Sequence, residues 1–569
     1  MKRLMVLVLL AMFSINSVSA CTTMIVGKGA TVDGSIIVAH SDDDELMDQR
    51  IVYVPAMDHA PGSKRPVYYD PDAFGGKNVR YVGSSRGPGY VDPSRPASKP
   101  LGYIPQISHT YAYFDGNYGI INEHQLAFGE CTNGAKFQPK QEPGKRIFYS
   151  AELSRVALER CATARQAIKL MGQLMEDYGY YGTGETLLVG DTMEAWVLEM
   201  CAVPNRKAGL WVAKRVPDDQ VFAAANEFRI REIDPNDPNL MYTKDLFKVC
   251  EGLGWWRPAE GKLDWLKTVS LGEYNHPYYS LRRVWRIFSR IKPSANFSPW
   301  VENGLTNAYP FSIKPDKKLS ARDVMDLYRD HYEGTEFDMT KGMAAGPFGS
   351  PERYFGPYDG KSPDVASPGR KMEGAWERPI SVHYAGYTFV NQARGWLPDP
   401  IGGICWFAPD KAATSCFVPF YAGATDLPSV YQTGDTDKFD RQTAWWAFNF
   451  VSNWANLKYS YMIKDIVAKQ QQLEAVEFTN LPKVDQQALA LYKNDPKAAK
   501  QYLTKYLTDN ANKVVKEWWA LGDYLIAKYD DGYVNKPKMA EDVGYPNWWL
   551  DQVGYADGPT TYKETKNDN

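Results

Sequence analysis

Cys21 is the first residue that the sequence assigns to a folded structure. Residues 1–20 begin with Lys2 and Arg3, continue with an apolar run over residues 4–13 and end in small residues up to Ala20. This pattern is typical of a cleavable export signal, because an apolar run of about ten residues is too short to span a bilayer. We therefore expect the fold to begin at Cys21 and the mature protein to be exported, either periplasmic or secreted, from a bacterium.

Cleavage after Ala20 has two alternative outcomes at Cys21. An ordinary signal peptidase would leave a free α-amine and a free thiol, whereas the letters Val18-Ser19-Ala20-Cys21 also fit a lipoprotein box, in which both groups are acylated or alkylated. The two outcomes exclude each other, because lipidation consumes the groups that a thiol nucleophile needs. The β-branched and apolar stretch 22–26 follows without a polar linker, which favours the free cysteine. A lipidated, non-catalytic envelope protein stays the alternative.

Charge and hydropathy exclude some kinds of partner. The 569 residues include 65 basic and 68 acidic ones, for a net charge of −3, and no basic stripe stands out. Nucleic acid is therefore not an expected partner. No apolar run near 18 residues follows the leader, so we expect no stable membrane insertion after signal cleavage. A homo-oligomer is compatible with the sequence.

Seven cysteines are too few for a disulfide scaffold in an exported chain of this length. Cys405 and Cys416 flank a turn-like segment in an expected hairpin. They fit either a disulfide or two buried small hydrophobic residues, which is the usual place of a free cysteine.

The hydrophobic pattern predicts alternating strands and helices. Two strands, 22–26 and 35–39, are joined by a glycine-rich turn that brings His40 back toward Cys21. The later elements are an irregular excursion over 57–110, a hairpin over 111–130, one or two helices over 151–175, four strands between 186 and 224, a loop-rich middle over 231–380, strands at 381–390, 403–407 and 415–420, and helices from 441 into the 530s. This order indicates an α+β or layered fold with antiparallel sheets.

An N-terminal cysteine can combine two catalytic groups in one residue. A thiol has an ordinary pKa of about 8.5 and is mostly protonated at neutral pH. The α-amine, with a pKa of about 7.7 to 8.0, is a base within reach of the same sulfur. Cleavage before Cys21 would therefore create a nucleophile together with its base.

Several segments together resemble the C69 dipeptidases, which are N-terminal nucleophile hydrolases related to penicillin V acylases and choloylglycine hydrolases. The segments that carry the resemblance are Cys21-Thr22-Thr23, Asp33-Gly34-Ser35, residues 39–43, Asn122-Glu123 with Gly129-Glu130, residues 225–230, Arg282-Arg283-Val284-Trp285-Arg286, residues 346–349, 406–408, 418–421 and 444–451. They cover most of the mature chain. The resemblance implies an αββα sandwich of antiparallel sheets, with residues 21–435 as the catalytic domain and 436–569 as a helical region packed on it.

The resemblance also implies roles for individual residues. Asp43 matches the acidic residue that orients the N-terminal amine, Asn226 the side-chain donor of the oxyanion hole, and Arg282 the active-site arginine. The neighbouring Arg283 leaves that last register open. No metal and no organic cofactor are implied.

Three further residues are candidates for substrate binding: His40, Asp42 and Asn122. The relatives commonly carry arginine where this chain has His40, so a fixed positive charge is replaced by a side chain that is largely neutral at pH 7. We expect a more pH-dependent activity as a result. Asp42 begins an acidic run, 42–45, that also fits a solvated loop.

These observations predict an exported cysteine dipeptidase acting on short peptides. Carboxylates near Cys21 would bind a substrate ammonium group, and arginines would bind a terminal carboxylate. An N-acyl amide hydrolase of the penicillin V acylase or bile-salt hydrolase type is the alternative within the same fold.

Overall fold

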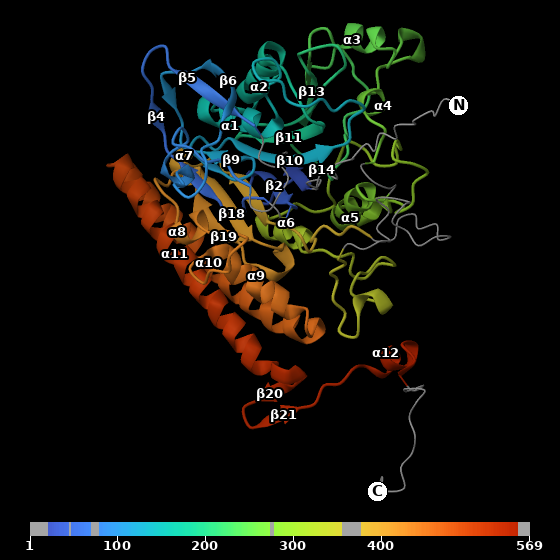
Figure 1. Cartoon of the computed structure of the whole chain (residues 1–569), viewed down its shortest axis with the longest axis vertical. Helices are drawn as coiled ribbons and strands as arrows, with labels where there is room; N and C mark the ends of the chain where they lie inside the picture. Colours follow the sequence, from blue (N-terminus) through green and yellow to red (C-terminus); the bar gives the residue numbers. More distant parts are fainter. Residues whose placement is uncertain (1–20, 45–46, 70–78, 274–277, 355–376, 556–569) are drawn as a thin grey trace, which may run out of the picture.

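Two antiparallel sheets packed face to face form the centre of the protein (Figure 1). The structure, a computed structural model, describes residues 21–44, 47–69, 79–273, 278–354 and 377–555. Within these residues one sheet has the strand order β16-β14-β1-β2-β17-β18-β19 and the other β15-β13-β12-β11-β10-β9-β8-β3. With helices packed outside both sheets, this arrangement confirms the predicted α+β sandwich.

Cys21 directly precedes the central strand pair of the first sheet. β1 pairs with β2 on one side and with β14 on the other, and the register places Thr22 opposite Ser41. The strands of this sheet are β1 (Thr22–Val26), β2 (Ile36–Asp42), β14 (Val221–Ala224), β16 (Ser312–Ile313), β17 (Tyr387–Ala393), β18 (Gly403–Pro409) and β19 (Val418–Tyr421).

The second sheet carries the strand that faces Cys21, β10. Its strands are β3 (Val52–Val54), β8 (Tyr113–Asp115), β9 (Gly119–Asn122), β10 (Ala127–Asn133), β11 (Gly184–Gly190), β12 (Ala195–Cys201), β13 (Leu210–Val216) and β15 (Leu240–Tyr242). β9 pairs with β10 only at Ala127 and Ile121, so the edge of β10 beyond Ala127 has no strand partner on that side within the described chain.

Successive side chains of β1 and β2 point to opposite faces of the sheet and so alternate between two hydrophobic cores. Met24 and Val26 pack outward with the helices, whereas Cys21 and Ile25 pack between the sheets. Residues that pair across an antiparallel ladder lie on the same face. His40, which pairs with Thr23, and Asp42 therefore lie on the inner face with Cys21.

Gly129 allows the two sheets to approach closely beside the site. A Cβ atom at this position would lie 2.7 Å from Oγ1 of Thr23. Any side chain at this position would therefore push β10 away from β1.

Two helices cover the outer face of the second sheet: α1 (Ser150–Arg160) and α2 (Ala164–Tyr178). The predicted helical stretch 151–175 is thus divided in two. The division falls at Thr163, whose side chain accepts a hydrogen bond from the backbone N–H of Gln166 and so caps the N-terminus of α2.

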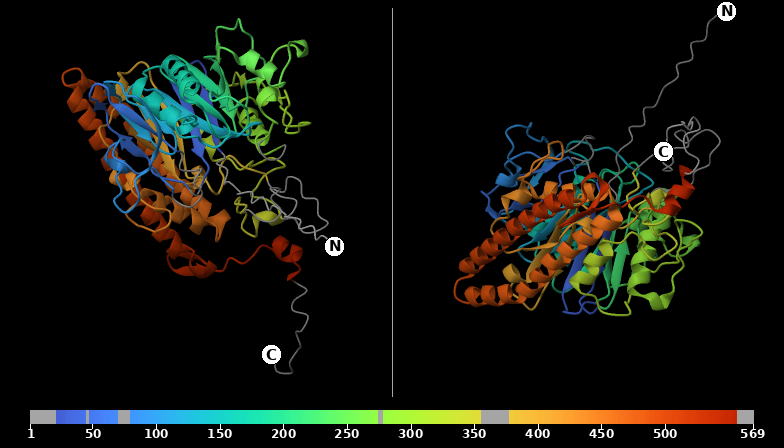
Figure 2. Two further views of the ribbon diagram at one scale, coloured as in Figure 1. Left: turned by 45° about the horizontal axis from the view of Figure 1, so that its top comes forward. Right: turned by 90° about the horizontal axis from the view of Figure 1, so that it is seen from below.

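The outer face of the first sheet is covered by α5 (Leu281–Ile291), α6 (Ala321–Tyr328) and part of α10 (Tyr459–Tyr492). α9 (Ala444–Ala455) and α11 (Pro496–Lys528) contribute to the same hydrophobic core as Cys21. Figure 2 shows α10 and α11 lying side by side along one flank. The remaining helices are α3 (Leu246–Gly252), α4 (Trp265–Val269), α7 (Asp399–Gly402), α8 (Ser429–Gln432) and α12 (Asn547–Gln552).

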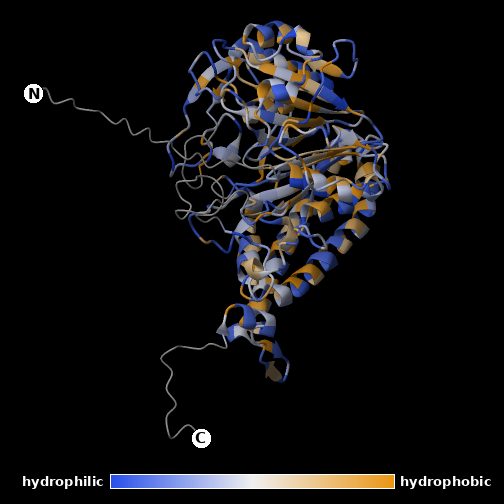
Figure 3. Ribbon diagram, turned by 90° about the vertical axis from the view of Figure 1, so that its right-hand side faces the viewer, coloured by the Kyte–Doolittle hydropathy of each residue, from blue (hydrophilic) through white to orange (hydrophobic). Residues whose placement is uncertain are grey.

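Beyond α11 the chain leaves the body as an extended segment (Figure 1), and the same part projects below the body in Figure 3. It contains β20 (Val534–Lys536), β21 (Met539–Glu541) and α12. No helix among the described residues has the length and apolar character needed to cross a membrane.

Two details differ from the sequence prediction. The excursion 57–110 was expected to be irregular, but its described part contains two small two-stranded sheets, β4 (Met57–Asp58) with β7 (His109–Thr110) and β5 (Lys64–Tyr68) with β6 (Pro100–Pro105). Cys405 and Cys416 are both buried free cysteines, so the disulfide alternative is wrong and the packing alternative is observed. The leader, residues 1–20, lies outside the described residues.

Candidate active site

Cys21 lies fully buried between the two sheets, directly before β1. Its nitrogen is joined to Ala20 in the uncut chain. The pKa of its thiol is well above the ordinary value, first because of burial and then because of the negative charges of Glu130, Asp42 and Asp43. The thiol of the uncut chain is thus protonated and a weak nucleophile at neutral pH.

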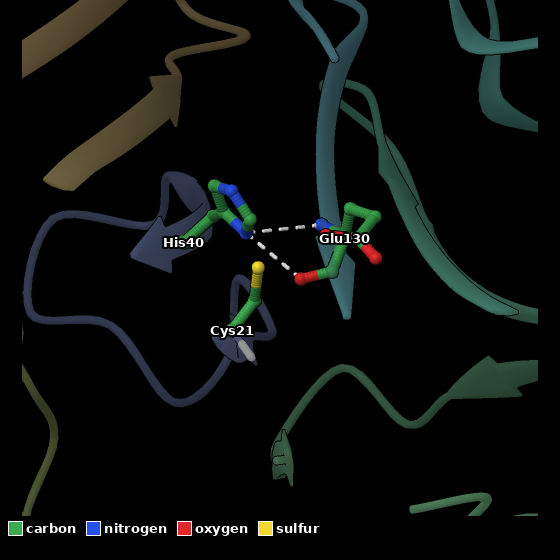
Figure 4. A group of neighbouring side chains, drawn as sticks. All are labelled: Cys21, His40 and Glu130. Carbon is green, nitrogen blue, oxygen red and sulfur yellow. Dashed lines mark hydrogen bonds between the residues drawn. The ribbon is translucent and has the colours of Figure 1, made fainter. Parts of the chain in front are cut away.

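His40 bridges Cys21 and the unpaired edge of β10. Its Nδ1 lies 2.8 Å from the backbone oxygen of Glu130 and 3.3 Å from the backbone nitrogen of the same residue (Figure 4). Nε2 is buried and has no hydrogen-bond partner among the described residues. Burial lowers the pKa of His40 to about 4, so the imidazole is neutral at neutral pH.

This neutral state corrects one expectation. The sequence suggested that His40 would make the activity more pH-dependent. A group with a pKa of about 4 does not titrate between pH 5.5 and 8, so His40 gives no such dependence near neutrality.

The Glu130 side chain comes from β10 and approaches the sulfur of Cys21. The Sγ of Cys21, a ring nitrogen of His40 and a carboxylate oxygen of Glu130 all lie within 4.8 Å of one another. Thr132 donates its hydroxyl to Oε1 of Glu130 at 3.0 Å, while Oε2 is buried without a hydrogen-bond partner among the described residues. The pKa of Glu130 is well above its usual range, because the carboxyl is buried and lies beside Glu185.

Cysteine, histidine and glutamate at this spacing are also donor types found in metal sites. Nδ1 of His40 is already hydrogen-bonded to the main chain of Glu130. A structural zinc site uses four protein donors, and a catalytic one uses three with an open position. Metals bind the deprotonated thiolate and carboxylate, whereas the pKa values of Cys21 and Glu130 are both well above their usual ranges, so we assign these three side chains no metal.

Asp43 and Arg378 form a buried ion pair beside Cys21. Nη2 of Arg378 lies 2.6 Å from Oδ2 of Asp43, and Ser41 donates its hydroxyl to the same oxygen at 3.1 Å. Burial raises the pKa of Asp43, whereas the positive charge of Arg378 lowers it. The second oxygen, Oδ1, has no hydrogen-bond partner among the described residues. It is therefore available to a group such as the amine of a processed Cys21.

Asp42 lies on the inner face beside these groups but has different partners. Its Oδ2 accepts a hydrogen bond from Nδ2 of Asn117 at 2.7 Å. Burial raises its pKa to about 7, against the lowering effect of hydrogen bonds from Tyr387 and Asn117. The Asp42 carboxyl therefore titrates near neutral pH.

The arginine that contacts Cys21 is Arg283 and not Arg282, which decides the register that the sequence left open as far as the contacts are concerned. Nη1 of Arg283 donates to the backbone oxygen of Cys21 at 2.8 Å and to Oγ1 of Thr22 at 2.9 Å. Adjacent positions on a helix differ by about 100° around its axis, so Arg282 points elsewhere. It pairs with Glu377 at 3.1 Å and lies over the ring of Phe337.

Asn226 is connected to the same arginine. Its backbone has φ of 60°, a left-handed conformation that asparagine adopts more readily than most residues. Its Oδ1 accepts from Nη2 of Arg283 at 2.6 Å, and its Nδ2 donates to the backbone oxygen of Thr132 at 2.8 Å. A side-chain amide carries two N–H groups, so the second one is available to an oxyanion.

Asn122 makes no side-chain hydrogen bond to Cys21, Arg283 or Asn226 among the described residues. Its Nδ2 donates to the backbone oxygens of Leu158 and Cys161, and its Oδ1 accepts from the backbone of His124 and Leu126. Both donors and the acceptor are therefore used to tie the β9–β10 turn to the end of α1. The geometry does not support the prediction that Asn122 binds substrate.

Glu130 and Arg378 are neighbours of the site to which the sequence analysis gave no role. Glu130 stands within one of the segments that carry the family resemblance, and that was a usable sign that it lies near the site. Arg378 contacts Asp43 across 335 positions of sequence. No local sequence pattern predicts a contact between residues so far apart in the chain.

The depressed pKa of His40 predicts a loss of stability in acid. As pH falls, the unfolded chain binds the proton near pH 6.5 and the folded chain only near pH 4, so stability present above pH 6.5 is lost progressively below it. Between pH 6.5 and 4.5 this amounts to about 2–3 kcal/mol. We expect the free energy of unfolding, measured with denaturant, to fall by that much more in the wild type than in His40→Gln. Equal falls in the two proteins would contradict the assignment.

Comparison with known proteins gives a consistent picture. The sequence profile of peptidase family C69 matches residues 20–69 and 116–472. A probable dipeptidase of Salmonella dublin is 26% identical over 434 residues, which are 74% of this chain and 85% of that protein. Dipeptidase A of Lactobacillus helveticus is 24% identical over 451 residues, 77% of this chain and 82% of that protein.

A probable dipeptidase B of Streptococcus pyogenes serotype M1 extends the similarity to 92% of this chain and 96% of its own length, at 23% identity. Among solved structures, penicillin V acylase from Agrobacterium tumefaciens matches 70% of this chain and 86% of its own, with 11% identity and a TM-score of 0.28. At this TM-score the similarity carries no argument about the fold, which is defined by the two sheets of this structure.

Proposed function

The chain belongs to peptidase family C69, and on this premise we propose that it is an exported cysteine dipeptidase whose nucleophile is the thiol of Cys21. One observation carries the proposal. Cys21 is the residue that signal cleavage would expose, and it lies buried at the start of β1 among Asp43, Arg283 and Glu130. The printed names of the relatives support dipeptides as the substrate class.

Cleavage supplies the base that the thiol lacks. With residues 1–20 removed, the α-amine of Cys21 accepts the thiol proton while the sulfur attacks the scissile carbonyl. The amine then returns the proton to the leaving amine, and water hydrolyses the acyl-enzyme. The raised pKa of the thiol makes such a base necessary.

Neighbouring residues have separate roles in this scheme. Asp43, held by Arg378, orients the Cys21 amine through Oδ1, the oxygen left without a partner among the described residues. Arg283 fixes the Cys21 carbonyl and so the direction of the nucleophile. Asn226 donates its second N–H to the oxyanion of the tetrahedral intermediate.

The burial of Cys21 also bears on the lipoprotein alternative. Its side chain is fully buried between two sheets, in a core that includes Ile25 and Cys131. A diacylglyceryl group on the sulfur could not be accommodated there without separating the sheets, because protein interiors are close-packed. This packing favours a free thiol.

The proposal is tested on protein expressed with its native leader. We expect the intact mass of the mature chain to correspond to a start at an unmodified Cys21, and the purified protein to hydrolyse members of a dipeptide panel. A diacylated Cys21 would contradict the proposal. Hydrolysis of only N-acyl amides such as penicillin V or conjugated bile salts would replace it by the acylase alternative.

A further inference from the structure

Three carboxyl groups act on the Cys21 thiol, those of Glu130, Asp42 and Asp43, and only Asp43 has a function in the proposed mechanism. Asp43 pairs with Arg378 and Asp42 with Asn117, each through Oδ2, and the Oδ1 atom of each is buried without a hydrogen-bond partner among the described residues. Glu130 has the largest electrostatic effect of the three on the thiol. Its carboxylate lies within 4.8 Å of the sulfur, and its Oε2 is buried without a hydrogen-bond partner in the described part of the chain.

A dipeptide differs from an N-acyl amide by a positive charge near the scissile bond. Its α-ammonium group is attached to the carbon next to the scissile carbonyl. Once the sulfur has added to that carbonyl, the ammonium nitrogen is three bonds from the sulfur, or about 3–4 Å. A carboxylate oxygen within 4.8 Å of the sulfur is therefore close enough to accept a hydrogen bond from the ammonium group of the substrate.

We propose that Glu130 is the anchor for the substrate's α-ammonium group and thereby the residue that selects substrates with a free amino terminus. This inference rests on the proposed function and deepens it. The open edge of β10 makes the arrangement feasible, because no strand of the described chain separates Glu130 from Cys21 and His40 there.

The pairing of Glu130 with Glu185 fits this role. Burial, and after it the neighbouring Glu185, raises the pKa of Glu130 well above its usual range. Glu130 is therefore mainly protonated in the empty site at neutral pH, and its negative charge acts on the thiol of Cys21 only when the carboxyl is ionised. An ammonium group that binds favours the ionised Glu130 and at the same time neutralises it, so a carboxylate and a thiolate can coexist.

An uncharged substrate lacks this compensation. An acetylated dipeptide brings no cation to Glu130 and leaves a buried carboxyl without its partner. A site built to pair with a polar substrate group discriminates strongly against analogues that lack the group. Selection for dipeptides thus follows from a residue on β10 and requires no apolar acyl pocket.

The test compares one substrate pair on matched variants of the mature enzyme. The pair is Ala-Ala and N-acetyl-Ala-Ala, and the variants are Glu130→Gln and Asp42→Asn, which each neutralise one carboxyl. We expect wild type to favour Ala-Ala, and Glu130→Gln to lower kcat/KM for Ala-Ala by about 100-fold, chiefly through KM, because a buried charge pair is lost. Activity on N-acetyl-Ala-Ala should change by less than about threefold. Asp42→Asn should keep the preference of the wild type.

Several outcomes would overturn the inference. Equal losses on both substrates in Glu130→Gln would make Glu130 a structural residue, and a collapse of selectivity in Asp42→Asn would transfer the anchor to Asp42. A wild type that hydrolyses both substrates equally well would exclude the subsite without any variant. If Glu130→Gln does not fold, Glu130→Asp keeps the charge, and it should retain the preference for Ala-Ala at a higher KM.

The same assays separate this inference from the proposed function. Iodoacetamide should alkylate Cys21 in Glu130→Gln with a stoichiometry of one, which shows an intact nucleophile. A wild type inactive on every dipeptide would refute the proposed function. A wild type that cleaves Ala-Ala with unchanged selectivity in Glu130→Gln would refute the role of Glu130 alone.

Discussion

Replacement of Cys21 by alanine is expected to abolish dipeptide hydrolysis, with a loss in kcat/KM of at least about 10³-fold. The substitution removes the sulfur on which the proposed acyl-enzyme forms and leaves the α-amine in place. The measurement is the rate of Ala-Ala hydrolysis by mature protein whose amino terminus has been confirmed by mass spectrometry. Protein that is cleaved after Ala20 but inactive shows that the loss lies in catalysis and not in processing.

Two variants make this result specific. Cys21→Ser keeps a hydroxyl at the same position and should retain weak activity, because a hydroxyl is harder to deprotonate than a thiol. Cys405→Ala changes another buried cysteine, which lies on β18 in the same core. It should keep the activity while losing stability on the order of 1 kcal/mol from the removed sulfur. Full activity in Cys21→Ala would place the nucleophile elsewhere in the chain.

The position of Cys21 at the start of the fold was predictable because it depends on local sequence. The leader-like pattern ends at Ala20, and the alternating residues 22–26 form a strand directly after Cys21. The period of two also determines that Cys21 and Ile25 share a face. Features that depend only on covalent order and periodicity could therefore be obtained without the structure.

Contacts made across long stretches of chain could not be obtained in this way. Arg378 reaches Asp43 from 335 residues away, and Glu130 reaches Cys21 from the opposite sheet. Their side chains are ordinary charged residues in sequence, and only the packing of the two sheets brings them to the cysteine. The pKa of His40 has the same origin, because burial in that packing lowers it.

The choice between Arg282 and Arg283 shows the limit of helical periodicity. Both residues lie in α5 and both are buried. A pattern that recurs every 3.6 residues defines a face of about 100° or more, and two adjacent residues can both belong to it. Which of them reaches Cys21 depends on how α5 is rotated against β14, and that is a property of the tertiary structure.

The two arginines provide a matched pair for the second large effect. Arg283→Met should destabilise the fold by about 3 kcal/mol or more, because it leaves buried acceptors on Cys21 and Asn226 without their donor. At a pH and temperature where the variant stays folded, kcat should fall by about 10²-fold or more, since both the proposed nucleophile, Cys21, and the proposed oxyanion donor, Asn226, lose their support. Unfolding in denaturant and Ala-Ala hydrolysis measure the two effects.

Arg282→Met is the control at the neighbouring position. It removes an ion pair with Glu377 and the contact with the ring of Phe337, so stability should fall there as well. Because no contact of Arg282 within the described residues reaches Cys21 or Asn226, kcat should stay within about threefold of the wild type. Stability loss in both variants with loss of kcat only in Arg283→Met separates positioning of the nucleophile from general support of α5. Loss of kcat in Arg282→Met alone would make Arg282 the active-site arginine. Equal loss of kcat in both variants would mean that each substitution acts only by disturbing α5.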